Sequence, residues 1–157
     1  MAEARRAAYH PHQLAGARFL IIEARFYDAI GALLLQGAEA ALREAGAAWD
    51  IVGVPGALEI PVAASIAVAA DKDIAGIVAL GCIIRGETYH FEIVANESAR
   101  GLMDVGIRLG LPVGNGILSV ENEAQALVRA DPQLGNKGAD AARAAMSLHA
   151  LKHAQVV

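Results

Sequence analysis

The sequence predicts an α/β fold, a three-layer sandwich in which helices cover both faces of a four-stranded parallel sheet. Four short runs of aliphatic and β-branched residues alternate with segments whose apolar residues have helical spacing. The short runs are apolar at nearly every position, which is typical of strands covered on both faces. The length of 157 residues fits one domain over residues 1–157. Residues 1–16 are expected to form a flexible N-terminal arm, because they lack periodicity and contain Pro11.

The first half of the chain opens with a predicted strand over residues 18–24, which reads RFLIIEA. Residues 28–45 follow with apolar side chains three and four positions apart, and this spacing predicts a helix. Gly46 comes directly after the helix, where glycine readily adopts the left-handed conformation that ends helices. Residues 49–54 form the second predicted strand.

The middle of the chain continues the alternation. A Pro-Gly turn leads into a predicted helix over residues 58–70, in which Pro61 is tolerable because it lies in the first turn. Residues 75–84, AGIVALGCII, form the third and most apolar predicted strand. One long helix is then predicted over residues 88–109.

The last third contains a fourth predicted strand over residues 112–120 and two helices over residues 122–130 and 137–153, separated by the turn DPQLGN. Strands and helices therefore alternate until two helices end the chain. Connections between parallel strands are almost always right-handed, and this rule places helices on both faces of the sheet. The predicted architecture is flavodoxin-like.

Composition excludes several classes of protein. Hydrophobic residues make up 55% of the chain and charged residues 19%, which excludes a disordered chain. This is more apolar surface than one small domain usually hides, so we expect a homo-oligomer. The net charge is −4 and no Lys/Arg-rich run is present, so no nucleic acid is expected as a partner.

The single cysteine, Cys82, has no partner for an internal disulfide, and a reducing, cytoplasmic setting is expected. The N-terminal residues lack the apolar region of a secretory signal, and no apolar run is long enough to span a membrane. No cluster of His, Cys and Asp residues has metal-ligand spacing, and no GxGxxG or Walker motif is present. We therefore expect no metal and no cofactor.

The candidate site lies where the strands end. In sheets of this kind, ligands bind beyond the carboxyl ends of the strands. The rule selects three segments with unexpected residue choices, which are residues 25–27, 55–59 and 85–90. These segments should meet in one place.

Residues 85–90, RGETYH, suit an anion. A glycine after a strand and a threonine near a helix start leave backbone N–H groups free, and the helix dipole favours negative charge there. Thr88 offers a hydroxyl, and His90 can transfer protons near neutral pH. The alternative is a capped helix with a histidine that is merely exposed.

Other candidates also have two interpretations. Glu59 either accepts hydrogen bonds from a polyhydroxylated ligand or is favoured by the helix dipole in a first turn. Phe26 either stacks on a ring or packs in the core. Arg129 and Lys137 either bind an anion or are solvated. Cys82 is expected to be a small core residue rather than a nucleophile, since no feature that would lower its pKa can be recognised.

Four motifs occur in an order and spacing that resemble one family. They are VPGALEIP at 54–61, ALGCIIRGETYHFEIV at 79–94, GILSVENEAQA at 116–126 and NKGADAA at 136–142. From about residue 19 to residue 151, the chain resembles the lumazine synthase family.

The resemblance implies a transferase of riboflavin biosynthesis. It would condense 5-amino-6-ribitylaminouracil with 3,4-dihydroxy-2-butanone 4-phosphate into 6,7-dimethyl-8-ribityllumazine, phosphate and water. It implies no cofactor or metal, a pentamer as the basic unit with active sites between subunits, and riboflavin synthase as a candidate partner. Whether pentamers assemble further, and whether the source has a second isoenzyme, stays open.

The resemblance also assigns roles to residues. His90 would be the catalytic, proton-transferring residue. The phosphate would be bound by Gly86, Glu87, Thr88 and, from the neighbouring subunit, Arg129. The pyrimidine and ribityl chain would be bound by Phe26, Gly56, Ala57, Leu58, Glu59, Cys82, Ile83, Ile84, Asn115 and Lys137, the last two from the neighbouring subunit.

Three residues depart from the family pattern. Tyr27 stands where asparagine is common, Leu58 replaces a frequent phenylalanine, and Asn115 replaces an aromatic residue that closes over the ring. These departures affect ring binding and leave the acid–base and phosphate groups in place. The alternative function is a flavin- or lumazine-binding protein with little turnover, and a third is a structural shell protein, which the alanine-rich composition would suit.

Overall fold

The computed structural model describes residues 14–154. Most of the predicted arm, residues 1–13, lies outside the described residues. Within its last three residues Leu14 is buried, and its amide N–H donates a hydrogen bond to the carbonyl oxygen of Ala45 over 3.3 Å. Strands and helices alternate as β1 (Arg18–Ala24), α1 (Asp28–Glu44), β2 (Ala48–Val54), α2 (Glu59–Ala70), β3 (Ile74–Ile84), α3 (His90–Leu109), β4 (Val113–Val120), α4 (Glu123–Ala130) and α5 (Lys137–His153).

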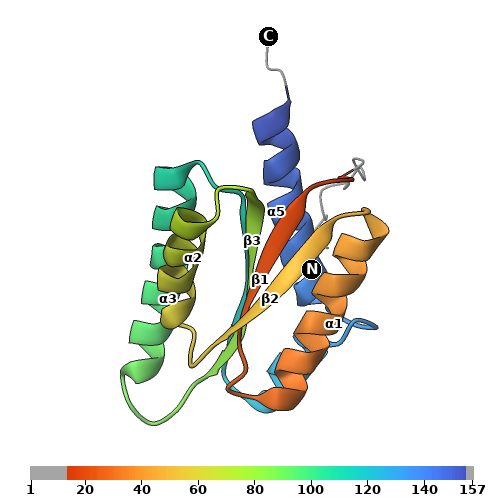
Figure 1. Ribbon diagram of the computed structural model, residues 1–157. Helices are drawn as coiled ribbons and strands as arrows, with labels where there is room; N and C mark the ends of the chain where they lie inside the picture. The colour runs from red at the N-terminus through yellow and green to blue at the C-terminus, as the bar shows by residue number, and fades with distance from the viewer. Residues whose placement is uncertain (1–13, 155–157) are drawn as a thin grey trace.

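The four strands form one parallel sheet in the order β2-β1-β3-β4. Helices α2 and α3 pack together on one face, while α1 and α5 pack together on the other (Figure 1). The predicted three-layer α/β class is confirmed. Each element begins and ends within two residues of its prediction, and the largest difference is at α3, which begins at His90 rather than at Thr88.

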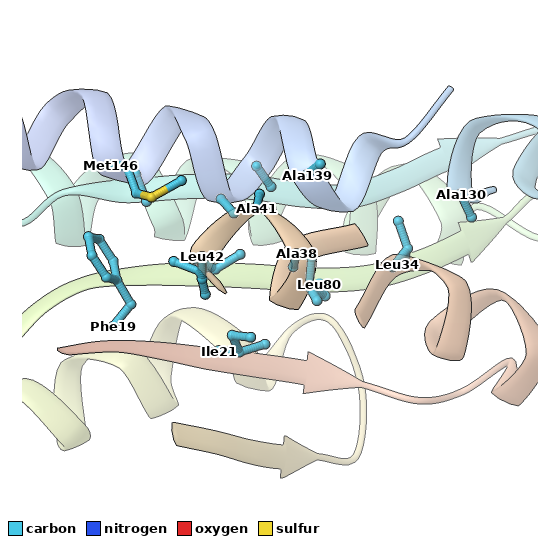
Figure 2. Close-up of a cluster of buried hydrophobic side chains, with 14 of the residues drawn as sticks. Phe19, Ile21, Leu34, Ala38, Ala41, Leu42, Leu80, Ala130, Ala139 and Met146 are labelled. Carbon is cyan, nitrogen blue, oxygen red and sulfur yellow. The ribbon is translucent and has the colours of Figure 1, made fainter. Parts of the chain in front are cut away.

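Two apolar cores fill the space between the layers. Successive side chains of a strand point to opposite faces, so Phe19 and Ile21 of β1 belong to one core and Leu20 and Ile22 to the other. The first core lies between the sheet and the pair α1 and α5, where Figure 2 shows Phe19, Ile21 and Met146 among its members. Because β1 buries both faces, it holds the two helix layers on one sheet.

Strand β2 corrects one expectation. All four strands were predicted to have both faces covered, but most of β2 is exposed, including Ile51 and Val52. The strand order explains the difference, because β2 lies at the edge of the sheet and pairs only with β1. Its apolar side chains are therefore available for burial against another molecule.

Glycines allow α5 to lie very close to α1 and to β4. A Cβ at Gly138 of α5 would lie 1.9 Å from the carbonyl oxygen of Leu34 in α1. A Cβ at Gly114 of β4 would lie 1.8 Å from the carbonyl oxygen of Ala141 in α5. Both neighbours are backbone atoms, so the helices cannot keep this spacing with a larger residue at either position.

This close approach generates a prediction about stability. Gly138→Ala should lower the free energy of unfolding by at least about 1–3 kcal/mol, because the added methyl forces backbone atoms apart. Gly53→Ala is the matched control, since a Cβ there meets nothing within 4 Å. Urea unfolding of both variants measures the difference. Equal stability of the two variants would contradict the close packing of α1 and α5.

Candidate active site

The three predicted segments meet in one cavity of about 480 Å³ beyond the carboxyl ends of β1, β2 and β3. The chain leaves β1 toward β2 on one side and later returns to β3 on the other, which makes this a topological switch point where ligands bind. The cavity is lined by Ala24, Phe26, Tyr27, Pro55, Gly56, Ala57, Leu58, Glu59, Cys82, Ile83, Ile84, Gly86, Thr88, His90, Phe91 and Val94.

The segment after β1 supplies the aromatic side of the cavity. Phe26 is 74% exposed, so the alternative that it packs in the core is wrong. Its ring meets the ring of Tyr27 edge-to-face, with 5.1 Å between the ring centres. An exposed aromatic face beside a cavity is suited to stacking on a flat ring.

The segment after β2 supplies a carboxylate. Glu59 is the first residue of α2, so both interpretations of this residue agree with its position: the helix dipole favours it, and it lines the cavity. A Cβ at Gly56 would lie 3.1 Å from Oε2 of Glu59. Glycine at this position therefore leaves room beside the carboxylate for a ligand to approach.

The segment after β3 supplies polar groups at the start of a long helix. Gly86, Thr88 and His90 line the cavity, and His90 is the first residue of α3. The backbone N–H of His90 donates a weak hydrogen bond to Oγ1 of Thr88 over 3.4 Å. These groups lie at the positive end of the dipole of a 20-residue helix, which favours an anion. Glu87 is exposed and does not line the cavity.

Arg85 is the positively charged residue nearest in sequence to these groups, yet its guanidinium is bound by other residues. Its guanidinium forms ion pairs with Glu92 and, over 2.8 Å, with Glu121, and these carboxylates raise its pKa. The guanidinium also lies 4.2 Å from the centre of the Phe91 ring. Two carboxylates thus satisfy Arg85, and it is poorly placed to neutralise a bound phosphate.

The end of β3 forms the floor of the cavity. Cys82 is only 8% exposed, and burial raises the pKa of its thiol to about 11. A thiol with this pKa is almost entirely protonated near neutral pH and is a poor nucleophile. Its predicted role as a small core residue is confirmed. Ile83 and Ile84 follow it and line the same cavity.

Besides Glu87, three predicted residues do not line this cavity. Arg129 is exposed on α4 and donates to the carbonyl oxygen of Gln125 over 3.0 Å. Lys137 begins α5 and pairs with a carboxylate one turn further on. Oδ1 of Asn115 on β4 accepts a hydrogen bond from the backbone N–H of Ile117 over 2.9 Å. One chain therefore brings together only part of the predicted site.

Five residues that line the cavity were absent from the predicted set: Ala24, Tyr27, Pro55, Phe91 and Val94. Helical spacing was a usable signal for Val94, because it lies one turn after His90 and so shares its side of α3. Tyr27 and Pro55 belong to two of the three segments that the switch-point rule selected. Ala24 and Phe91 adjoin those segments, and only the fold shows that they reach the same space. Within residues 14–154, no cluster of three or more His, Cys, Asp or Glu side chains is arranged to hold a metal. None of the helices in this range is long and apolar enough to cross a membrane.

Fold and cavity together define a doubly wound α/β protein with a ligand-binding pocket at its switch point. One side of this pocket suits a flat ring, and another suits an anion. Comparison with known proteins agrees: residues 16–153 match the family model described as 6,7-dimethyl-8-ribityllumazine synthase. The chain belongs to this family, and the resemblance noted from its motifs is confirmed.

Individual relatives are similar over most of their length. A protein of Methylocella silvestris named 6,7-dimethyl-8-ribityllumazine synthase is 63% identical over 141 residues, which are 87% of this chain and 86% of the relative. A protein of the same name from Azorhizobium caulinodans is 60% identical, covering 87% of each chain. A protein of Rhodopseudomonas palustris named 6,7-dimethyl-8-ribityllumazine synthase 1 is 53% identical over 97% of this chain and 96% of its own length.

The buried thiol generates a prediction about pH. At pH 8, a thiol pKa of about 11 in place of 9.0 leaves about 100-fold less thiolate. Alkylation of Cys82 by iodoacetamide should therefore be at least that much slower in the folded protein than in the same protein in urea. Its rate should still be rising between pH 9 and pH 10.5. A rate that levels off near pH 9 would show that the thiol is not buried as described.

Proposed function

We propose that this chain condenses 5-amino-6-ribitylaminouracil with 3,4-dihydroxy-2-butanone 4-phosphate to give 6,7-dimethyl-8-ribityllumazine, phosphate and water, a step of riboflavin biosynthesis. The observation that carries the proposal is a single cavity that joins Phe26, Glu59, Thr88 and His90 in a chain of this family. The activity is that of a transferase and uses no metal or cofactor in this proposal.

The uracil substrate fits the half of the cavity formed after β1 and β2. The exposed ring of Phe26 would stack on the pyrimidine. Ile83 and Ile84 line the cavity, and their backbone would bind the polar edge of the pyrimidine. The ribityl hydroxyls would donate to the carboxylate of Glu59, in the space that Gly56 leaves beside it.

The phosphate substrate fits the half formed by the start of α3. Backbone N–H groups near Gly86 and the hydroxyl of Thr88 would bind the phosphate oxygens at the positive end of the helix. Because Arg85 is already paired with two carboxylates, the neutralising guanidinium has to come from elsewhere. Arg129 of a neighbouring subunit would supply it, and Lys137 of that subunit would lie near the substrates.

His90 would move protons between the two substrates. The amine of the uracil attacks the ketone and water leaves, which gives an imine. Loss of phosphate follows, and attack of the ribitylamino nitrogen on the remaining carbonyl closes the second ring and releases a second water. Each step transfers a proton near neutral pH, and an imidazole at the first position of α3 lies in the cavity where these groups meet. Holding the two reactants together supplies much of the acceleration, so His90 assists the reaction rather than making it possible.

Assembly of several copies would complete the site. Helix α2 is apolar on nearly all sides, yet only Ile60, Pro61 and Ala64 are buried, while Val62 and Ile66 are 60% and 65% exposed. A helix that is apolar all round is normally buried all round. A homopentamer would cover this face and place Arg129 of one subunit beside the cavity of the next. A cytoplasmic location and riboflavin synthase as a partner stay predictions.

The test of the proposal is to mix the purified protein with both substrates and record absorbance and fluorescence of the lumazine product. Formation of product and release of one phosphate per turnover would support the proposal. Tight binding of lumazine without turnover would instead identify a flavin- or lumazine-binding protein, the alternative function.

Two variants separate binding from chemistry. Arg129→Ala should raise KM for the phosphate substrate about 10- to 100-fold, because a hydrogen bond between charged groups is lost. His90→Ala should lower kcat by ~10²–10⁴-fold, the range for a group that transfers protons. Steady-state kinetics measures both effects. The assigned roles are wrong if Arg129→Ala lowers only kcat and His90→Ala raises only KM.

A second pair of variants tests assembly. Ile66→Glu should convert the oligomer into smaller species and abolish activity, because a charge would be buried at the covered face of α2. Ala40→Glu places the same charge on the exposed side of α1 and should leave assembly intact. Light scattering at micromolar concentration measures the mass of both. An active monomer of either variant would contradict a shared site.

A further inference from the structure

Two histidines lie side by side at the end of α5, far from the cavity. His149 and His153 are four residues apart and therefore lie on the same side of the helix. Their ring centres are 4.3 Å apart and their planes are inclined by 48°. Figure 1 shows this end of α5 beyond the end of the sheet where β1 and β3 begin, opposite the carboxyl ends of the strands.

The fold holds one of these rings in place. Nδ1 of His149 lies 3.3 Å from the carbonyl oxygen of Ala75 at the start of β3. The same ring meets the buried ring of Phe19 edge-to-face, with 5.6 Å between the centres. If Nδ1 carries the proton and donates a hydrogen bond to this carbonyl, Nε2 carries no proton, and its lone pair is available to a metal ion. A backbone carbonyl that binds the other ring nitrogen is the usual support of a metal-binding histidine.

The spacing of the rings suits one metal ion with a right-angled geometry. A metal about 2.0–2.1 Å from one nitrogen of each ring places the ring centres about 4.5 Å apart at an N–metal–N angle near 90°, and about 5.2 Å apart at a tetrahedral angle. The observed 4.3 Å is closer to the first value. Nitrogen ligands at right angles are typical of Cu²⁺ and Ni²⁺, and Cu²⁺ binds such ligands most tightly.

Nearby charges both attract and repel a cation at this histidine pair. The last carbonyl groups of α5 form the negative end of the helix dipole, which attracts a cation. Lys152 lies on the same turn and repels one. Burial, and next the charge of His153, lower the pKa of His149, and this direction favours the neutral ring, the form that binds metal. We propose that the rings of His149 and His153 are the two protein ligands of a site for a divalent late transition-metal ion. Among these ions Cu²⁺ should bind most tightly, and water would complete its coordination.

The experiment titrates the purified protein with Cu²⁺ at pH 7.5 and records the electron paramagnetic resonance spectrum. One tight equivalent per chain should bind, with hyperfine structure from two nitrogen donors. His153→Gln should weaken this binding at least about tenfold, because losing one of two linked contacts removes the gain from chelation. Activity and circular dichroism of this variant without metal should match the parent protein, since the pair is remote from the cavity.

Control variants make the result decisive. His149→Gln should weaken binding like His153→Gln, and circular dichroism shows whether it folds. The double variant His10→Gln/His12→Gln removes the remaining histidines outside the cavity and should keep the tight equivalent. The thermal midpoint should rise with Cu²⁺ in the parent and in this double variant, but not in His153→Gln. Unchanged binding in His153→Gln, or loss of the tight equivalent in the double variant, would overturn the proposal.

Discussion

Burial of both faces of β1 is the constraint on which the rest of the structure depends. Phe19 and Ile21 point to the layer of α1 and α5, and Leu20 and Ile22 point to the layer of α2 and α3. This strand lies inside the sheet, with β2 on one side and β3 on the other. The chain therefore turns in opposite directions around β1, and a cavity opens where the directions part.

The strand order decides which polar groups lie in the cavity. Its polar groups lie at strand ends and helix starts, because these are the places where backbone N–H groups stay free. The half proposed to bind phosphate lies at the start of α3, and the carboxylate of Glu59 lies at the start of α2. Positive charge is scarce at the cavity, since Arg85 beside it is neutralised by Glu92 and Glu121. A phosphate needs a guanidinium that this chain does not place there.

Association of several copies would account for both the incomplete cavity and the exposed apolar face of α2. The cavity lacks Arg129 and Lys137, and α2 leaves apolar side chains such as Ile66 in water. Association of copies would bury the apolar face and would deliver the missing charges in the same event. Stability and catalysis would then depend on the same interface. The close contact of Gly138 with the backbone of Leu34 fixes where α5, and with it Lys137, is presented.

Sequence alone determined the element order, the parallel sheet and the three segments of the cavity, because hydrophobic periodicity and the switch-point rule are local or topological signals. It also determined the family, since motifs such as RGETYH are specific. Tertiary structure alone decided that Phe26 is exposed, that β2 is an exposed edge, and that Arg85 is held by two carboxylates. These outcomes depend on which segments become neighbours in space, and the pattern of one segment carries no information about what packs against it.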